Sequence, residues 1–198
     1  NRPGYDFIIQ GMSGIMDVTG EPNGPPQKAG VAFADIFTGL YSVIAIQAAL
    51  SQREHTGRGQ HIDLALFDCM VGVLANQGMN YLTSGVSPLR LGNAHPNIAP
   101  YEVFPTVDGW FILAVGNDRQ FSSFCEVIDL MELPGDPRFR DNAARLANRA
   151  ELSGTISLRS REWQRDRLLA ALEVAGVPAG PINSIGQAFE DPQVRHRG

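Results

Sequence analysis

Residues 30–50 read GVAFADIFTGLYSVIAIQAAL, and Asp35 is the one carboxylate among small, aromatic and aliphatic side chains. From Ile36 to Ser51 the apolar residues are too dense to form a stripe on one side of a helix. Such density is typical of a helix that is buried on most of its faces. The stretch therefore predicts a buried helix with a carboxylate immediately before its first residue.

Two interpretations of Asp35 follow from this position. Aspartate is a preferred N-cap, whose side chain accepts hydrogen bonds from the free N–H groups of the first turn, and the pattern alone favours this role. The second interpretation is a nucleophile, because the positive end of a helix favours the ionised carboxylate even among apolar neighbours. Gly30, Ala32 and Ala34 are small enough to let a substrate approach, which capping alone does not require.

The residues that follow predict an alternation of helix and strand. The string REHTGRGQ (53–60) contains two glycines that should end the first helix, and HIDLALF (61–67) has the alternation of a strand. A second apolar helix is predicted from Asp68 to about Leu82. Helix, strand and helix in this order indicate an α/β fold.

Glycines and prolines dominate residues 85–100, and a loop of this length is usually a linker or a functional segment. Beyond it, YEVF and WFILAV flank Asp108-Gly109 and predict a hairpin, with Pro105 placing the first strand at a sheet edge. These residues begin a smaller α+β unit. Its predicted helices are 119–130, 142–159 with a break, 161–175 with Ser160 as cap and Gly176 as stop, and a short helix from the capping-box string SIGQ at 184.

Composition excludes several classes of function. The net charge is −5 with no basic cluster, so nucleic acids and anionic membranes are not expected partners. No run reaches the ~18–20 uninterrupted apolar residues of a membrane span, which predicts a soluble protein. The four histidines, at positions 55, 61, 95 and 196, lack metal-binding spacing, and no metal site is expected.

The two cysteines of the sequence indicate whether the protein belongs to a reducing or an oxidising cellular compartment. Cys69 and Cys125 are far apart and form no CxxC motif, so we expect two buried thiols in a reducing compartment. The scarcity of lysine beside abundant arginine hints at a GC-rich bacterial genome and hence the cytoplasm, although a mitochondrial homologue would look similar. The first residue is not methionine, and we expect the sequence to be a fragment of a longer chain.

Five strings occur in one order along the chain: RPGYDFIIQGMSGIMDVTG, GVAFADIFTGLYSVIAIQAAL, TGRGQHIDLALFD, GNAHPNIAPYEVF and DGWFILAVGNDRQF. Together they resemble the family III CoA-transferases of the CaiB/BaiF type, and most of all the members that act on dicarboxylic acids. The resemblance covers essentially the whole chain and implies an interlocked homodimer. It divides the sequence into part of a Rossmann-like large domain (1–84), a linker and active-site loop (85–100), a small α+β domain (101–180) and the start of a return segment (181–198).

The resemblance also assigns site residues. It places the family's nucleophilic aspartate at Asp35, and it implies that Arg2, Pro3, Gly4 and Tyr5 border coenzyme A. The loop from Gly92 to Asn97, with Gly92, Asn93 and His95 as substrate contacts, would close over the reacting carbonyl. A short glycine run present in some relatives is replaced here by NAHPN.

The implied activity is transfer of coenzyme A between an acyl-CoA and a small carboxylic acid, with no tightly bound cofactor and with coenzyme A as substrate. Succinyl-CoA or another small dicarboxylyl-CoA is the expected donor. Two alternatives are an α-methylacyl-CoA racemase and a non-catalytic acyl-CoA binding module. The racemase is less favoured, because the resembling racemases have Gly-His-Asp where this chain has Gly4-Tyr5-Asp6, and a phenol of pKa ~10 is a poor replacement base.

Overall fold

The sequence around Asp35 forms the longest helix, α2 (Phe33–Thr56), in the computed structural model, which describes residues 4–198. The helix begins at Phe33 rather than at Ile36, and Gly57 ends it in the left-handed conformation, with φ at 69°. A glycine adopts this conformation without the steric conflict that a Cβ would introduce. The predicted stop in the string REHTGRGQ is therefore confirmed at Gly57.

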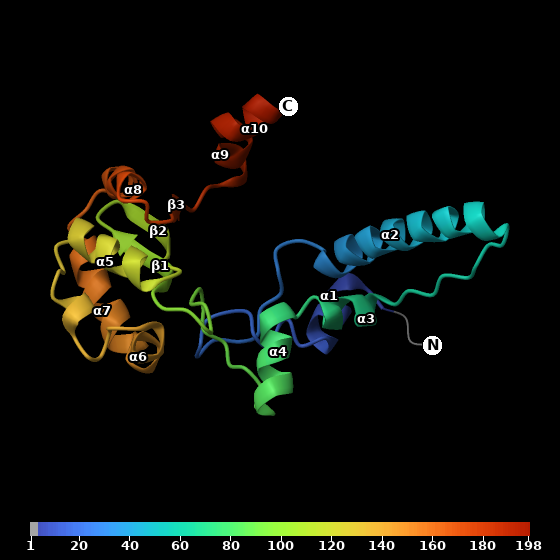
Figure 1. Ribbon diagram of the computed structural model, residues 1–198, viewed down its shortest axis with the longest axis horizontal. Helices are drawn as coiled ribbons and strands as arrows, with labels where there is room; N and C mark the ends of the chain where they lie inside the picture. The colour runs from blue at the N-terminus through green and yellow to red at the C-terminus, as the bar shows by residue number, and fades with distance from the viewer. Residues whose placement is uncertain (1–3) are drawn as a thin grey trace. The chain divides into compact units, whose positions relative to one another are not determined.

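Residue contacts divide the chain into two units, Asn1–Gly92 and Asn93–Gly198, and the division lies inside the predicted linker. The first unit contains α1 (Asp6–Met12), α2, α3 (Leu66–Gly72) and α4 (Ala75–Ser84). Figure 1 shows α1 and α3 beside the beginning of α2, and both helices contact it. Ile9, Ala34 and Met70 form the buried cluster between these three helices.

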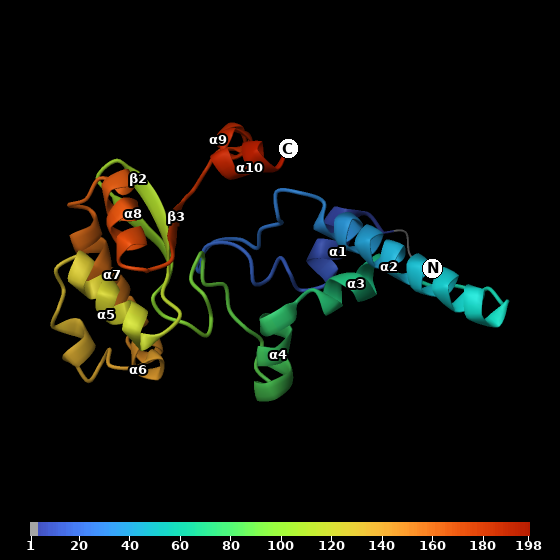
Figure 2. The ribbon, with the colours of Figure 1, turned by 45° about the horizontal axis from the view of Figure 1, so that its top comes forward.

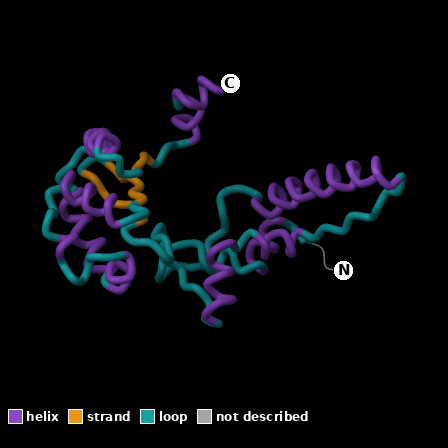
Figure 3. The backbone as a smooth tube through the Cα atoms, viewed as in Figure 1, coloured by secondary structure: helices purple, strands orange, loops and turns teal. Residues whose placement is uncertain are grey.

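Two differences from the sequence-based prediction lie in the segment after α2. Residues 61–65 form no strand, and in the described part of the chain every strand lies in the second unit, as Figure 3 shows in orange. A strand needs a neighbouring strand for its backbone hydrogen bonds, and the alternation of HIDLALF cannot provide one. The single helix expected from Asp68 to Leu82 is divided into α3 and α4, with Ala75 at a positive φ of 48° after the break.

Helix α2 is also far more exposed than predicted. Ala34 is its one buried residue, and Leu40, Val43 and Ile44 are each more than 40% exposed. The expectation of burial on most faces is wrong for residues 4–198, because α1 and α3 contact α2 and supply too little surface to cover 24 residues. By length and composition α2 could also cross a membrane, which the count of uninterrupted apolar residues had not shown. Core helices of soluble proteins pass the same test.

The second unit is built on a three-stranded antiparallel sheet in the order β1–β2–β3. Strands β1 (Tyr101–Thr106) and β2 (Gly109–Ala114) form the predicted hairpin, and β1 with its Pro105 is an edge strand, as expected. Strand β3 (Ala179–Pro181), which the sequence pattern did not reveal, pairs with β2. Figure 2 shows the sheet beside helices of the same unit.

The helices of this unit are α5 (Asp118–Val127), the 3₁₀ turn η1 (Leu133–Gly135), α6 (Asn142–Ala147), α7 (Arg149–Ser160), α8 (Arg165–Val174), α9 (Ile185–Glu190) and α10 (Pro192–Arg197). Side chains of the sheet, α5, α7 and α8 form one core, which includes the tilted ring pair Phe104 and Phe111. The break within 142–159 and the capping box at Ser184 are confirmed. Ser160 is not the cap of α8: it is the last residue of α7, and its hydroxyl donates to the Pro105 carbonyl.

Candidate active site

Asp35 lies in the first turn of α2, three positions after the N-cap residue, which is Ala32. The side chain of Ala32 cannot accept a hydrogen bond, so the helix has no cap from its own N-cap residue. The prediction that Asp35 is the N-cap is therefore wrong. The reason is that Phe33 and Ala34 already have helical geometry, which places Asp35 inside the helix rather than before it.

Capping is supplied instead from another helix. Asp6, the first residue of α1, accepts the backbone N–H of Ala34 through Oδ1 at 2.8 Å. This bond satisfies one of the first-turn donors that a helix cannot pair by itself. The residue directly before Asp35 is thus held by a carboxylate that lies 28 positions earlier in the chain.

Gln10, one turn after Asp6 on α1, extends this contact and is completely buried. Its Oε1 accepts the N–H of Ala29 at 2.9 Å, and its Nε2 donates to the Val31 carbonyl at 3.2 Å. The same Nε2 donates to Asp6 Oδ2 at 2.8 Å. The two side chains therefore bond to each other and to the segment 29–34, which leads into α2.

Ala34 is also fixed through its side chain. It is fully buried against Ile9 and Met70, with Phe37 packed at the edge of the same cluster. The small size of this residue, which the sequence argument linked to substrate approach, is required by packing between helices. Gly30 differs, because a Cβ built on it would meet no atom within 4 Å.

The carboxylate of Asp35 itself is exposed. Within residues 4–198 it forms no hydrogen bond and no ion pair, so both of its oxygens are available to a reacting group. The predicted shielding of Asp35 from water is not provided by the described residues. A carboxylate that caps a helix would have its lone pairs engaged, whereas this one is free to act as a nucleophile.

Of the predicted coenzyme A contacts, Gly4 and Tyr5 lie directly before α1. Arg2 and Pro3 are outside the described residues. Tyr5 is the N-cap residue of α1 and its side chain is exposed, while a Cβ on Gly4 would come to 3.1 Å from Ile9 Cδ1. Gly4 and Tyr5 therefore precede the same short helix that holds the segment before Asp35.

The predicted substrate loop is divided between the two units. Gly92 ends the first unit, where its N–H donates to the Gly20 carbonyl at 3.1 Å, and its φ is +60°. Asn93 and His95 begin the second unit. The contacts of these three residues place Gly92 with Asp35 in one unit, and Asn93 and His95 in the other.

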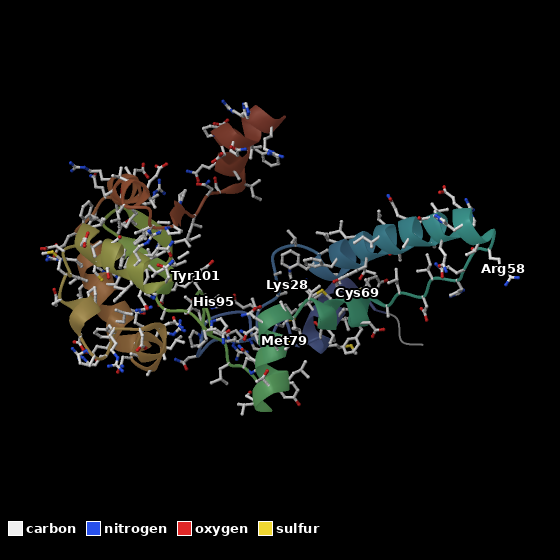
Figure 4. All side chains as sticks on the ribbon, viewed as in Figure 1. Lys28, Arg58, Cys69, Met79, His95 and Tyr101 are labelled. Atoms are coloured by element: carbon white, nitrogen blue, oxygen red, sulfur yellow. The ribbon has the colours of Figure 1, made fainter. Side chains whose placement is uncertain are left out.

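His95 is held firmly within the second unit. Its ring packs on Tyr101 at a centroid distance of 5.1 Å, and Figure 4 shows the two labelled side chains near each other. Its Nδ1 accepts the N–H of Asn97 at 3.1 Å, so the nitrogen that can donate in this arrangement is Nε2. Arg149 donates to its carbonyl at 2.6 Å.

Two further side chains fix the residues after His95. Asn142 donates to the Asn97 carbonyl at 2.9 Å and accepts the N–H of Ala99 at 3.1 Å. Arg145, only 1% exposed, donates to the Ala99 carbonyl at 2.7 Å. The loop is thus anchored to α6 and α7, and no sequence pattern had pointed to these contacts.

The described residues contain no group of three or more His, Cys, Asp or Glu side chains that could hold a metal ion. Cys69 and Cys125 are both free and buried, as expected from the sequence. Burial raises the pKa of the Cys125 thiol to about 12, with the nearby Glu132 carboxylate contributing in the same direction. Such a thiol remains protonated near neutral pH and is a weak nucleophile.

Known proteins resemble the chain along its whole length. Residues 1–198 match the model of CoA-transferase family III. The chain is 58% identical over 195 residues to the succinate–glutarate CoA-transferase of Agrobacterium fabrum, covering 98% of this chain and 49% of that protein. It is 41% identical over 197 residues to the succinyl-CoA:glutarate CoA-transferase of Homo sapiens, covering 100% of this chain and 45% of that protein.

A solved structure is also similar to this chain in both fold and sequence. The crystal structure of a CAIB/BAIF family protein from Brucella suis superimposes with a TM-score of 0.83 at 63% identity, covering all of this chain and 52% of that chain. The fold is thus the mixed helix and sheet fold of these proteins. The chain belongs to CoA-transferase family III. It spans about half the length of the curated relatives it matches.

Sequence reasoning missed Asp6 and Gln10. The string DFIIQG does contain a signal, because its two polar residues are four positions apart among apolar ones and so lie on one face of a helix. The pattern cannot show what that face contacts. The partners at positions 29, 31 and 34 become visible only in the fold.

Proposed function

We propose that the complete protein transfers coenzyme A from a small dicarboxylyl-CoA, such as succinyl-CoA, to a carboxylic acid, with Asp35 as the covalent nucleophile. The observation that carries the proposal is the exposed, unpaired carboxylate of Asp35 at the beginning of α2 in a member of this family. The names of the relatives, which include succinate, succinyl-CoA and glutarate, support this substrate class.

The first half of the reaction forms a covalent enzyme. A carboxylate oxygen of Asp35 attacks the carbonyl carbon of the donor thioester, the C–S bond breaks, and a mixed anhydride and the CoA thiolate result. The thiolate then attacks the Asp35 carbonyl carbon, and the donor acid leaves as its carboxylate. The product is a thioester between Asp35 and coenzyme A.

The second half runs the same steps with the acceptor. The acceptor carboxylate attacks the aspartyl thioester and releases the thiolate, which then attacks the acceptor carbonyl of the new anhydride. Acceptor acyl-CoA leaves and the Asp35 carboxylate is restored, so one thioester replaces another. The thioester energy is carried through covalent intermediates, and no step calls for a tightly bound cofactor.

The anhydrides must be protected from water, because they hydrolyse readily. Since Asp35 is exposed within residues 4–198, this protection would come from bound acyl-CoA and from surfaces of the complete protein. We place coenzyme A beside residues 2–5, and the substrate acid beside Gly92, Asn93 and His95. An anchored His95 with a free Nε2 donor is suited to a carboxylate oxygen.

We also propose that the complete protein is a homodimer in the cytoplasm, without nucleic acid or membrane as partner. The apolar residues of α2 are compatible with the dimer, because an extended exposed apolar surface marks a contact with another protein surface or with a membrane, which the vesicle arm of the test below distinguishes. In this proposal other segments of the homodimer cover Leu40, Val43 and Ile44. Sedimentation of the complete protein, with and without lipid vesicles, tests it: a monomer, or recovery with the vesicles, would contradict it.

The activity is tested with the complete natural protein and a panel of acyl-CoA donors and carboxylic acids. We expect labelled glutarate to enter acyl-CoA when succinyl-CoA is the donor, and we expect an acyl or CoA adduct on the peptide that contains Asp35 when no acceptor is present. Preference for branched monocarboxylic or aromatic acids would contradict the substrate class. Exchange of the α-proton in deuterated water at the rate of turnover would favour the racemase, and coenzyme A binding without exchange would favour the binding module.

A further inference from the structure

Resting on the proposed role of Asp35, we propose that Asp6 and Gln10 form a positioning pair that holds the nucleophile in its reactive geometry. Neither side chain takes part in the covalent steps proposed above. Their side chains act on the backbone of segment 29–34, and through it on the first turn of α2 that carries Asp35.

The hydrogen bonds of the pair form a closed set. Asp6 uses Oδ1 for the Ala34 N–H and Oδ2 for the Gln10 amide. Gln10 uses Oε1 for the Ala29 N–H and Nε2 for both Asp6 and the Val31 carbonyl. Each oxygen of the pair has a donor, and one arrangement of the Gln10 amide satisfies the three bonds that this amide makes.

The burial of Gln10 increases the effect of these bonds. Gln10 is 0% exposed and Asp6 is half-buried, so the hydrogen bonds that join them to each other and to segment 29–34 are partly screened from water. Hydrogen bonds in such surroundings are stronger than in solvent, and an unmatched partner is unfavourable. The loop before α2 therefore has one preferred path, and Ala34 is held both by Asp6 and by the buried contact of its methyl group with Ile9 and Met70.

The anchor matters for the reaction because it fixes the position of Asp35. A nucleophile must approach the thioester carbonyl along a narrow range of directions, and a displacement of about 1 Å can reduce a rate roughly 100-fold. An ordinary helix cap has no such consequence. The two roles are therefore separable by comparing the rate of covalent chemistry with stability.

The experiment uses Asp6→Ala and Asp6→Asn in the complete natural protein, with Asp108→Ala as the matched control. Asp108 accepts the N–H of Arg165 at 2.8 Å in the first turn of α8, so the control also removes a carboxylate cap that comes from another part of the chain. Three quantities are measured: the single-turnover rate of adduct formation on the Asp35 peptide, the affinity for coenzyme A, and the melting temperature.

We expect Asp6→Ala to slow adduct formation roughly 100-fold with little change in coenzyme A affinity. Asp6→Asn should have a smaller effect, because its oxygen can still accept the Ala34 N–H while its amide faces the amide of Gln10. Asp108→Ala should lower the melting temperature and leave the rate per folded molecule unchanged. Wild-type adduct formation by folded Asp6→Ala would overturn the proposal and leave the proposed function intact, whereas adduct or transfer in Asp35→Ala would overturn the function itself.

If Asp6→Ala does not fold, Asp6→Asn and Gln10→Glu decide the question. Asp6→Asn places an N–H group opposite the side-chain N–H of Gln10. Gln10→Glu places an oxygen opposite an oxygen of Asp6. The two substitutions together restore a donor opposite an acceptor, with the Val31 carbonyl losing its partner. A double variant that forms the adduct faster than either single variant supports the pair, and single variants at the wild-type rate, or a double variant no faster than the slower single one, would overturn it.

Discussion

Asp6 and Ala34 are joined by a 2.8 Å hydrogen bond from the backbone N–H of Ala34 to Asp6 Oδ1, and the next residue along the chain is Asp35. A carboxylate from α1 therefore caps α2, while the carboxylate in the first turn of α2 is left exposed and unpaired within the described residues. The two aspartates divide between them the tasks that the sequence pattern had assigned to Asp35. This division gives several measurable consequences.

Replacing Asp35 by alanine should abolish transfer with little loss of stability. Its side chain caps nothing, so the free energy of unfolding should fall only by the favourable interaction of one carboxylate with the helix end, about 0.3–1 kcal/mol. Activity and thermal unfolding of the complete protein measure the two effects. Asp63→Ala, which removes another exposed carboxylate of the first unit, is the control and should remain active. A large loss of stability in Asp35→Ala would mean that this carboxylate does hold the helix end.

Enlarging Ala34 should damage both packing and catalysis. A leucine at this fully buried position would overpack the contact with Ile9 and Met70, with an expected loss of about 1–3 kcal/mol, and would displace the first turn of α2. Adduct formation by the folded fraction should then be slower than in the wild type. Ala170→Leu is the matched control, since Ala170 is an exposed alanine of α8 in the second unit. Equal rates for the two variants would show that the first turn tolerates displacement.

Removing Arg145 should destabilise the second unit. This side chain donates to the carbonyls of Ala99 and Phe139, pairs with Asp118, and lies over the Phe121 ring at 4.6 Å. Methionine in its place would leave the two buried carbonyls without their donor, at about 1–3 kcal/mol each. Chemical denaturation measures the change. Arg140→Met, which removes an exposed surface pair with Asp141, should have a much smaller effect.

The Cys125 thiol gives a prediction about pH. Burial raises its pKa from 9.0 to about 12, so above pH 9.0 the unfolded chain loses a proton that the folded chain keeps. The stability contributed by this group is fully present below pH 9.0 and is lost as the pH rises toward 12. Denaturation between these values measures the slope, and Cys125→Ser should reduce it. Rapid alkylation of Cys125 in the folded protein at pH 8 would contradict the assignment of a buried, protonated thiol.

A charged residue introduced on α2 tests whether the proposed homodimer covers the apolar surface of this helix. Ile44→Glu, at a residue 64% exposed in the described chain, should disrupt the proposed homodimer or reduce the solubility of the complete protein, because a carboxylate would be buried without a partner. Gln52→Glu adds the same charge to the exposed end of the helix and serves as the control. Dimers of normal size and stability in both variants would mean that this surface faces solvent.

Features governed by neighbouring residues were predictable from the sequence. Gly57 ends α2, the strands around Asp108-Gly109 form a hairpin, and Ser184 with Gln187 forms a capping box. Each depends on backbone freedom or hydrogen bonds within a few positions, which are written directly in the local string. The family was also recognisable, because five long motifs in order are specific in a way that single glycines are not.

Features governed by distant residues were not predictable. The string at 61–67 alternates like a strand but has no strand to pair with in the described residues, and the density of apolar residues in α2 did not reveal that so much of it would be exposed. The cap of α2 and the anchors of the loop after His95 come from side chains 28 to 54 positions away. The sequence alone determined that a carboxylate stands at the beginning of a long apolar helix. Only the tertiary structure decided that Asp6 satisfies the N–H of Ala34 and leaves Asp35 free, because a hydrogen bond between two helices depends on how they pack together.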